Sequence, residues 1–489
     1  MRTAKKAANA DFLTAADRRR LARLGIGVRS IRKQWRLLND PPRYVNLLRP
    51  AVAGDGIRLF SAAERAAINN RFPSFFSGRG AVKFVPASGA ASRLFSFLKQ
   101  SAEESGNAEA ERRAFVRGLR ERRFAFSSDW LASHMGDFNR PKALIPFHRY
   151  GTEQRTALEE QLLETRALAE RLGGACHLHL TVASEQEGLF QREAERLRAK
   201  YSWAGPSFFS FSEQSDATQT IALGPEGKPL RQADGELALR PSGHGALLAN
   251  LAALEADLIF IKNIDNAMSE RLFPETVTTF VALGGLLLEL QRRVFVYLRR
   301  MTAGEYEKPF QNEVVDFLVQ ELSIPLPARF GEWRPVRKMD WARSRLHRPM
   351  RVCGVVPNRG EPGGGPFWAE RESGEDSLQI VEAAEVDPLS PAQQNIFAAA
   401  THFNPVFMAC AFKDFRGQMF DLERYADSGA GIISAKTWEG SPVKVLELPG
   451  LWNGGMADWT TLFVEVPAVV FAPVKTIIDL LRPEHQPEA

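Results

Sequence analysis

Cysteine is scarce in this chain of 489 residues. Only Cys176, Cys353 and Cys410 are present, far apart and each in an apolar setting. We therefore expect buried free thiols in a reducing cytoplasm and no disulfide framework. The sequence also contains no CxxC pair and no cluster of histidine with cysteine, so it gives no indication of a zinc site.

Long apolar runs and repeats are missing as well. No apolar run reaches the roughly 18 residues that a membrane-spanning helix needs, and the first residues lack the apolar core of a signal peptide. No internal repeat or low-complexity segment is present. With 44% hydrophobic and 25% charged residues, the composition is ordinary for a globular protein. We expect a cytoplasmic protein without a membrane span.

Positive charge is concentrated in the N-terminal segment. Residues 1–50 hold 13 Lys or Arg and 3 Asp or Glu, a net charge of +10, so the remainder carries about −5. Leu21, Leu24 and Ile31 recur among these bases, which is typical of a partly packed amphipathic segment. We expect residues 1–75 to form a basic helical extension. Contact with nucleic acid or anionic lipid is the alternative. We expect no nucleic acid, because no pattern of stacking aromatics accompanies the charge.

Short β-rich runs alternate with amphipathic helices along the rest of the chain. The clearest strands are "AVKFVP" (81–86), "HLHLTVA" (177–183) and "LIFIKNIDN" (258–266). This alternation predicts an α/β doubly wound sheet that is mixed and mainly parallel. We expect residues 76–489 to form the main domain, with a helical or irregular insertion at about 270–348.

Polar and small residues follow the predicted strands. In an open α/β sheet, ligands bind outside the carboxyl ends of the strands, near a topological switch point. The residues at these positions are therefore candidates for a functional site. They are Ser88, Gly89, Ala90, Ala91, Ser92, Arg93, Gln214, Gly243, His244, Gly245, Asp265, Glu382, Asn404 and Lys475.

The segment "FVPASGAASRLF" (84–95) has the features of an anion-binding turn. Its small residues let the backbone approach a phosphate, free N–H groups at a helix start favour an anion, and Arg93 can pair bidentately with phosphate oxygens. It fits neither Walker A nor GxGxxG, so a turn without a ligand is the alternative. The amide of Gln214 offers a donor and an acceptor that can read a pyrimidine edge, or it lies in a polar surface loop.

Asp265 ends a buried strand, where a carboxylate is well placed to hold Mg²⁺. A helix N-cap is an equally good interpretation, because Asp and Asn both cap well. Gly243 and Gly245 permit close backbone contact with a flat ring or a phosphate, or they form a plain turn. For His244 between them, a packing or hydrogen-bonding role is favoured over a role as base or metal ligand.

Taken in order, five segments resemble the UDP-sugar pyrophosphorylases, especially UDP-glucose pyrophosphorylase. The segments are "ASGAASR", "FSEQS", "GHGALL", "KNIDN" and "FVEVPAVVFAPVKTIIDLL", and the resemblance covers residues 80–485. It implies a nucleotide-diphospho-sugar transferase (GT-A-like) sheet and a nucleotidyltransferase-like catalytic domain. "GEPGGGPFW" and "ELPGLWNG" are also similar to signature strings of a bacterial family of unknown function, DUF4301.

The resemblance also implies roles for individual residues. The altered glycine loop would hold the nucleotide, Gln214 and the glycines around His244 would hold uracil, and Asp265 would bind Mg²⁺ bridging the phosphates. Glu382 and Asn404 would contact the sugar, whereas Arg93 and Lys475 would neutralise phosphate charge. The implied reaction is transfer of a uridylyl group from UTP to a sugar 1-phosphate, giving a UDP-sugar and pyrophosphate. The oligomeric state is open.

Two departures from the family pattern leave other functions open. The family loop G-G-x-G-T is replaced here by residues 88–92, and a methyl at Ala91 either blocks the closest phosphate approach or shifts the loop. The family lysine shortly after this loop has no clean match, and Lys99 is the nearest candidate. A non-catalytic nucleotide-sugar-binding protein and a glycosyltransferase with a nucleotide-sugar donor are therefore the alternatives.

Overall fold

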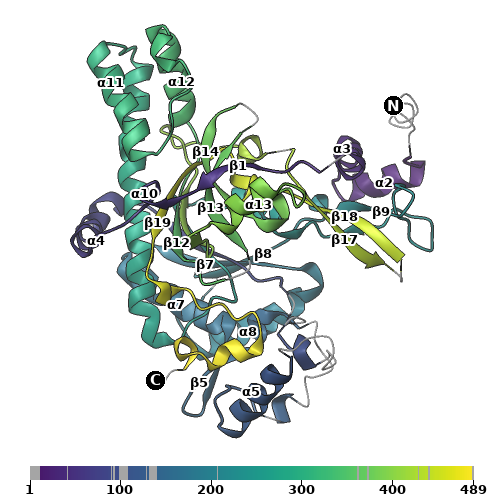
Figure 1. Cartoon of the computed structure of the whole chain (residues 1–489). Coiled ribbons are helices and arrows are strands. Elements are labelled where there is room, and N and C mark those ends of the chain that lie inside the picture. The colour runs from purple at the N-terminus through teal and green to yellow at the C-terminus, as the bar shows by residue number, and fades with distance from the viewer. Residues whose placement is uncertain are drawn as a thin grey trace.

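The computed structural model describes residues 12–40, 42–89, 91, 94–98, 108–127, 129–131, 140–205, 208–360, 363–371, 374–427, 429–438 and 441–486. Its centre is a mixed sheet that is mainly parallel, as the sequence predicts (Figure 1). The strands lie in the order β2 (Val52–Ala53), β3 (Gly56–Arg58), β19 (Thr460–Glu465), β12 (Met350–Pro357), β16 (Phe407–Ala411), β11 (Leu258–Lys262), β4 (Ala81–Pro86), β7 (Cys176–Val182) and β8 (Phe209–Glu213). Of these nine described strands, only β16 runs antiparallel to its neighbours in the order.

Helices cover the sheet because its central strands are apolar on both faces. Every residue of β11 is buried, as are the first five of β4. The helices α4 (Ala62–Phe76), α7 (Ala157–Arg171) and α10 (Phe273–Thr302) share one hydrophobic core with β11 and β12. A second core lies under α9 (Leu248–Ala252), and a third joins α7 and α8 (Glu187–Lys200) to β7.

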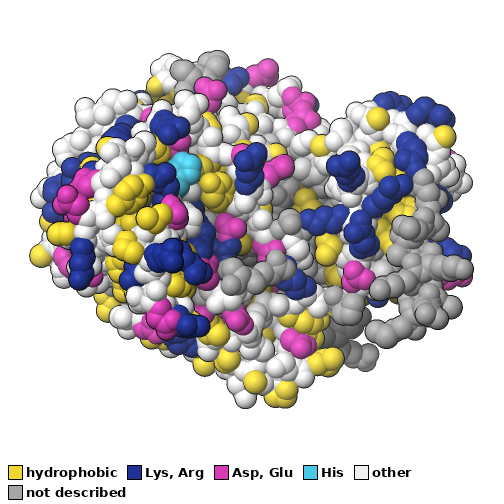
Figure 2. All heavy atoms as spheres, turned by 90° about the horizontal axis from the view of Figure 1, so that it is seen from above, with side chains coloured by type: hydrophobic (Ala, Val, Ile, Leu, Met, Phe, Trp, Pro, Cys, Tyr) yellow, Lys and Arg dark blue, Asp and Glu magenta, His cyan; other side chains and the backbone are white. Residues whose placement is uncertain are grey.

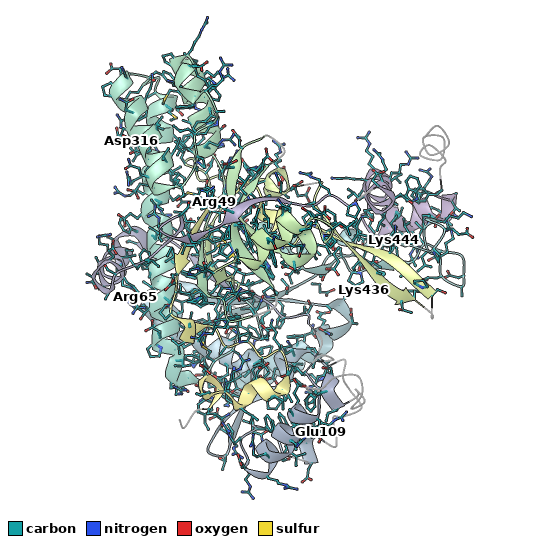
Figure 3. All side chains as sticks on the ribbon, in the orientation of Figure 1. Arg49, Arg65, Glu109, Asp316, Lys436 and Lys444 are labelled. Carbon is teal, nitrogen blue, oxygen red and sulfur yellow. The ribbon has the colours of Figure 1, made fainter. Side chains whose placement is uncertain are left out.

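The long helix α10 runs across the molecule (Figure 1). By length and composition it is apolar enough to cross a membrane, so the expectation that no run of this kind exists was wrong. However, 72% of its apolar window is buried inside the protein. The rings of Phe280 and Phe407 stack with their centroids 3.9 Å apart. Arg65 of α4, labelled in Figure 3, forms an ion pair of 2.6 Å with Glu275 of α10. The apolar length of α10 is therefore accounted for by core packing.

The region from 270 to 348, where we expected an insertion, is helical. After α10 come α11 (Lys308–Asp316) and α12 (Pro335–Leu346), which pack against each other and project from the sheet together with the end of α10 (Figure 1).

The first 75 residues contain strands as well as the expected helices. The helices α2 (Ala15–Arg23) and α3 (Val28–Asn39) belong to a lobe with a four-stranded sheet. Its strands are β10 (Leu239–Arg240), β9 (Thr220–Leu223), β18 (Ser441–Glu447) and β17 (Ile432–Trp438). The chain then enters the main body, where β1 (Asn46–Pro50) pairs with β13 (Gly364–Glu370), which pairs in turn with β14 (Asp376–Glu382).

The basic residues of this lobe lie on its outer face. Ile31 and Leu38 of α3 are buried against the sheet, whereas Arg29, Lys33 and Arg36 are exposed on the opposite side. Figure 2 shows Lys and Arg side chains gathered over this lobe, on the right of the view. Lys436 and Lys444 extend the positive charge onto β17 and β18 (Figure 3).

The contact of α10 with α4 gives a test of packing. A Cβ at Gly285 would lie 2.6 Å from Cγ2 of Ile68, whereas one at Gly188 of α8 would meet nothing closer than 3.8 Å. We expect Gly285→Ala to lower the free energy of unfolding by about 1–3 kcal/mol through overpacking. Gly188→Ala should leave it unchanged or raise it by up to about 1 kcal/mol. Urea denaturation measures both, and equal effects would contradict the packing argument.

Candidate active site

The predicted site residues lie mainly along one edge of the central sheet. Because β4, β11 and β8 are parallel, their carboxyl ends meet at the same edge. The small-residue turn follows β4, Asp265 follows β11 and Gln214 follows β8. The edge therefore has the position at which doubly wound sheets bind ligands.

Asp265 is a buried carboxylate between two lysines. Its Oδ2 accepts hydrogen bonds from Nζ of Lys475 at 3.0 Å and from Nζ of Lys142 at 3.2 Å. Burial raises the pKa of Asp265, but the two ammonium groups outweigh burial and hold the pKa below its usual value. The residue is thus ionised at neutral pH. It caps no helix, since the next helical turn begins at Glu270 with Ser269 as its N-cap.

The second oxygen of Asp265 has no partner. Its Oδ1 is buried and forms no hydrogen bond within the described part of the chain. Mg²⁺ prefers oxygen ligands and is commonly held by one or two carboxylates together with substrate phosphates. Among the described residues no group of three or more His, Cys, Asp and Glu that could hold a metal ion is present. Asp265 therefore suits a magnesium ion that takes most of its ligands from outside the protein, and not a closed protein cage.

Lys142 is the site residue that sequence reasoning missed. It begins the 3₁₀ helix η3 (Lys142–Leu144), its N–H donates to the Gly89 carbonyl at 3.0 Å, and its Nζ also donates to the Val474 carbonyl at 3.1 Å. Lys142 thereby joins the turn after β4, Asp265 and the C-terminal segment. The sequence signal was a lysine directly after Pro141, but it lies some 50 residues beyond the turn and the intervening helix α5 (Ala108–Arg120).

The turn after β4 has an open backbone at Gly89 and a buried methyl at Ala91. Ser88 is half-buried, and Gly89 is exposed, with open space within 4 Å of the position that a Cβ would take. Ala91 is 1% exposed, and its N–H donates to the Arg140 carbonyl at 2.9 Å. Its methyl therefore packs in the core and does not project toward the solvent side of the turn. The other candidates here lie outside the described residues; they are Ala90, Ser92, Arg93 and Lys99.

The segment that carries Lys475 is held by its own capping box. The backbone N–H groups of Lys475 and Thr476 both donate to Oδ2 of Asp479 at 2.8 Å. The N–H of Ile477 donates to the carbonyl of Leu94, beyond the turn after β4, at 3.0 Å. The side chain of Lys475 is 51% exposed, so its ammonium reaches Asp265 from the solvent side.

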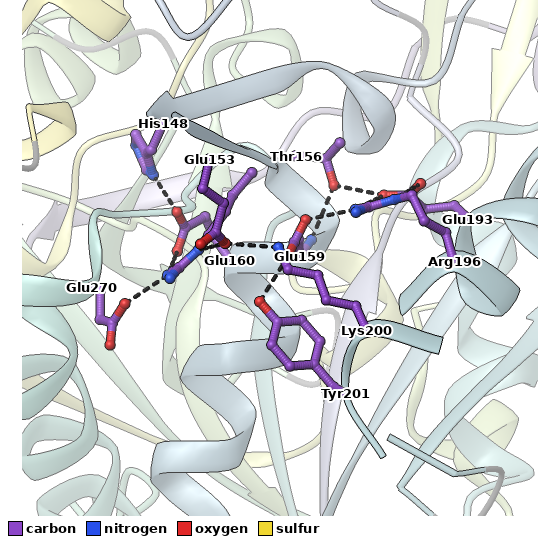
Figure 4. Close-up of polar contacts among 11 residues, drawn as sticks. His148, Glu153, Thr156, Glu159, Glu160, Glu193, Arg196, Lys200, Tyr201 and Glu270 are labelled. Carbon is purple, nitrogen blue, oxygen red and sulfur yellow. Dashed lines mark hydrogen bonds and ion pairs between the residues drawn. The ribbon is translucent and has the colours of Figure 1, made fainter. Parts of the chain in front are cut away.

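A buried relay of hydrogen bonds anchors the same segment to α7. Nε2 of His485 donates to the Ala472 carbonyl at 2.8 Å, and its Nδ1 lies 3.0 Å from Nε2 of His148. Nδ1 of His148 lies 2.9 Å from Oε1 of Glu160 (Figure 4). Burial raises the pKa of Glu160 well above its usual value and lowers the pKa of each histidine to about 3. The Ala472 carbonyl can only accept, and each neutral histidine donates from one ring nitrogen and accepts at the other. The hydrogen bonds therefore run in one direction along the chain, and Glu160 must donate to His148 as a protonated carboxylic acid.

His244 packs, as the favoured interpretation of the sequence predicts. Its ring stacks on Trp452 with centroids 4.1 Å apart, and its Nδ1 accepts from the N–H of Leu451 at 2.9 Å. Burial lowers its pKa, although Glu382 opposes this effect with Oε1 3.8 Å from Nε2. Glu382 and His244, far apart in sequence, are thus brought together. At Gly245 a Cβ would lie 2.1 Å from the Pro449 carbonyl oxygen, so this contact admits only glycine.

Gln214 presents a free amide at the sheet edge. The backbone N–H of Gln214 donates to the Val182 carbonyl at 3.1 Å, whereas its half-buried side chain forms no hydrogen bond within the ranges that the structure describes. Asn250 of α9 donates to Oγ of Ser212 and to the carbonyl of Glu213, each at 2.7 Å. These bonds tie the segment after His244 to the end of β8, beside Gln214.

Asn404 has a structural role. Its Nδ2 donates to the Gly354 carbonyl at 3.3 Å, and its Oδ1 accepts from the N–H of Val406 at 3.0 Å. Val406 has φ of 54°, so the amide supports a left-handed turn. Because both ends of the amide are engaged, the geometry gives the predicted sugar contact of Asn404 no support.

Asp265 gives a test of the site's electrostatics. Asp265→Asn should lower the free energy of unfolding by about 1–3 kcal/mol at pH 7, because two ammonium groups lose their carboxylate. The pKa of Asp265 is lower in the folded than in the unfolded protein. Its stabilisation is therefore present above about pH 4 and is lost as the pH falls through the folded pKa.

Urea denaturation between pH 7 and pH 3 measures this difference. The gap between wild type and Asp265→Asn should stay constant down to about pH 4 and narrow below it. Asp340→Asn, which changes an exposed carboxylate of α12, is the control and should have no effect. A gap that persists undiminished at pH 3 would show that the lysine contacts do not cause it.

Comparison with known proteins shows the family and the fold. The family model described as "Domain of unknown function (DUF4301)" matches residues 14–137 and 130–486. No curated protein matches. The fold is similar to that of the UDP-N-acetylglucosamine pyrophosphorylase of Trypanosoma brucei, with a TM-score of 0.53 and 14% identity over 97% of this chain and 80% of that one. A UDP-glucose pyrophosphorylase of Leishmania major gives a TM-score of 0.47 and 14% identity over 96% and 79% of the two chains. By the extent of the family match, the chain belongs to the DUF4301 family.

Proposed function

We propose that this chain is a Mg²⁺-dependent sugar-1-phosphate uridylyltransferase, which converts UTP and a sugar 1-phosphate into a UDP-sugar and pyrophosphate. The observation that carries the proposal is the buried, ionised Asp265, with Lys142 and Lys475 on one oxygen and no described residue bonded to the other. A carboxylate for a metal and two cations for phosphates are the groups that transfer of a nucleotidyl group needs.

The reaction requires positioning and charge neutralisation more than covalent chemistry by the protein. An oxygen of the sugar 1-phosphate attacks the α-phosphorus of UTP in line, and pyrophosphate leaves with the electrons of the broken P–O bond. Oδ1 of Asp265, which forms no hydrogen bond with the described residues, would hold Mg²⁺, and the ion would supply positive charge that neutralises the phosphates. Lys142 and Lys475 then turn from Asp265 toward the phosphates.

The position of each lysine suits a different task. Lys475 is half-exposed and approaches from the solvent side, so it can follow the leaving pyrophosphate. Lys142 is 12% exposed and has its backbone fixed on Gly89, so it can hold phosphate against the turn after β4. The free amide of Gln214 is the candidate reader of the uracil edge, and Glu382 beside His244 is the candidate contact for the sugar.

Release of pyrophosphate is the direct test of this function. Purified protein with Mg²⁺, each common nucleoside triphosphate and a panel of sugar 1-phosphates should release pyrophosphate with one pair, and UTP is the expected nucleotide. No release by protein that still binds UTP or a UDP-sugar would contradict the proposal. That outcome would favour a non-catalytic nucleotide-sugar-binding protein, or a glycosyltransferase if the bound sugar is passed to an acceptor.

The two lysines should each be needed for turnover. We expect Lys475→Ala and Lys142→Ala to lower kcat on the order of 100-fold, because each removes a cation from the developing charge of the transition state. Lys228→Ala, at an exposed lysine paired with Glu226, is the control and should keep full activity. A loss below threefold in either site variant would show that the lysine only balances Asp265.

A further inference from the structure

Three ionisable groups lie fully buried beneath the candidate active site. Nζ of Lys83 is 2.7 Å from Oε1 of Glu164, and Nζ of Lys262 is 2.6 Å from Oε2 of the same carboxylate. The lysine side chains are 0% exposed and that of Glu164 is 2% exposed. We call these three residues the buried triad. None of them belongs to the site described above.

The buried triad is connected directly to the site. Lys83 lies on β4, which leads into the small-residue turn, and Lys262 lies on β11, three residues before Asp265. Glu164 reaches both strands from α7. One turn earlier on α7, Nε2 of Gln161 donates to the carbonyls of Asn263 and Asn266 at 3.2 and 3.3 Å, on either side of Asp265.

The charge of the buried triad is not balanced. Two ammonium groups face one carboxylate, and their other contacts with the described residues add no anion: Lys83 also donates to the Gln161 carbonyl, and Lys262 lies 5.8 Å from the ring of Phe407. The titratable group facing Lys83 from β7 is the thiol of Cys176, whose pKa burial raises to about 12, so it is neutral at physiological pH. Among the described residues, one positive charge therefore stays uncompensated inside the protein.

An unmatched buried charge lowers the stability of the folded protein, so we expect a function that accounts for it. Burial lowers the pKa of both lysines, against the opposing effect of Glu164, and that of Lys262 falls to about 8. Burial also raises the pKa of Glu164, but the two lysines outweigh it and keep the carboxylate ionised. Lys262 therefore loses its proton in moderately alkaline solution, and the unmatched positive charge is then removed.

We propose that the buried triad is a charge-setting element, whose unmatched positive charge strengthens the binding of polyanionic nucleotide at the sheet edge and is withdrawn when one lysine loses its proton. The triad acts through the field and the placement of β4 and β11, so its members are positioning residues. The identity of the ligand rests on the proposed function, but the effect applies to any polyphosphate bound at this edge. At about 10–15 Å and a dielectric constant near that of water, about 80, a unit charge changes the affinity for a tetra-anion by roughly tenfold.

Lys262→Met and Lys83→Met are the matched test variants. Each leaves one lysine paired with Glu164, so each should fold and should unfold at a temperature equal to or above that of wild type at pH 7. Each should bind UTP and inorganic tripolyphosphate about tenfold more weakly at pH 7 by calorimetry. Wild-type affinity should fall between pH 7 and pH 9, and this fall should be absent in Lys262→Met. Lys228→Met is the surface control.

Stability against pH gives a second readout that needs no ligand. The pKa of Lys262 is lower in the folded than in the unfolded protein, so between about pH 8 and pH 10 the unfolded state binds more protons. Wild type should therefore gain stability relative to Lys262→Met over this range. Unchanged affinity and an unchanged pH profile in both variants would overturn the proposal, as would wild type that binds neither UTP nor tripolyphosphate. Tripolyphosphate binding with the expected pH profile, but without UTP binding or turnover, would support the proposal for the buried triad and contradict the proposed function.

Discussion

The carboxylate of Asp265 is the point on which the arrangement of the site depends. It takes cations from two segments that are 123 and 210 residues away in sequence, and its backbone carbonyl accepts from Val474. Removing both lysine-bearing segments would leave a buried charge without a partner, which is costly in a protein interior. The turn after β4, the strand end of β11 and the segment around Lys475 are thereby fixed against one another before any substrate arrives.

A single helix supports this arrangement from below. The buried face of α7 carries Glu160, Gln161 and Glu164, all of them buried. Glu164 holds β4 and β11 together, Gln161 holds the backbone around Asp265, and Glu160 reaches the C-terminal segment through two histidines. Polar groups at such positions weaken a core unless every one finds a partner. Burying these three polar side chains therefore positions the site and does not stabilise the fold.

The sequence carried much of this arrangement, but not all of it. Parallel strands with polar residues at their ends are a local pattern, so the sheet and the placement of Asp265 and Gln214 at its edge were predictable. Lys142 was not, because an intervening helix separates it from the turn that it contacts. Asn404 was predicted to contact a sugar, but its amide supports a turn instead. The residue type alone does not distinguish a sugar-binding role from a structural one. The pairing of β1 and β3 with distant strands depends on contacts that no local pattern reveals.

The long sequence separation between Asp265 and Lys475 also has a consequence for biosynthesis. A ribosome that adds 5–20 residues per second needs about 10–40 s to pass from one to the other. During that interval the strand that bears Asp265 exists without its full set of counter-charges, and the relay through His485 cannot yet form. Products truncated before residue 475 would lack the Lys475 contact with Asp265 and the relay through His485, and they should therefore be less stable than the complete chain.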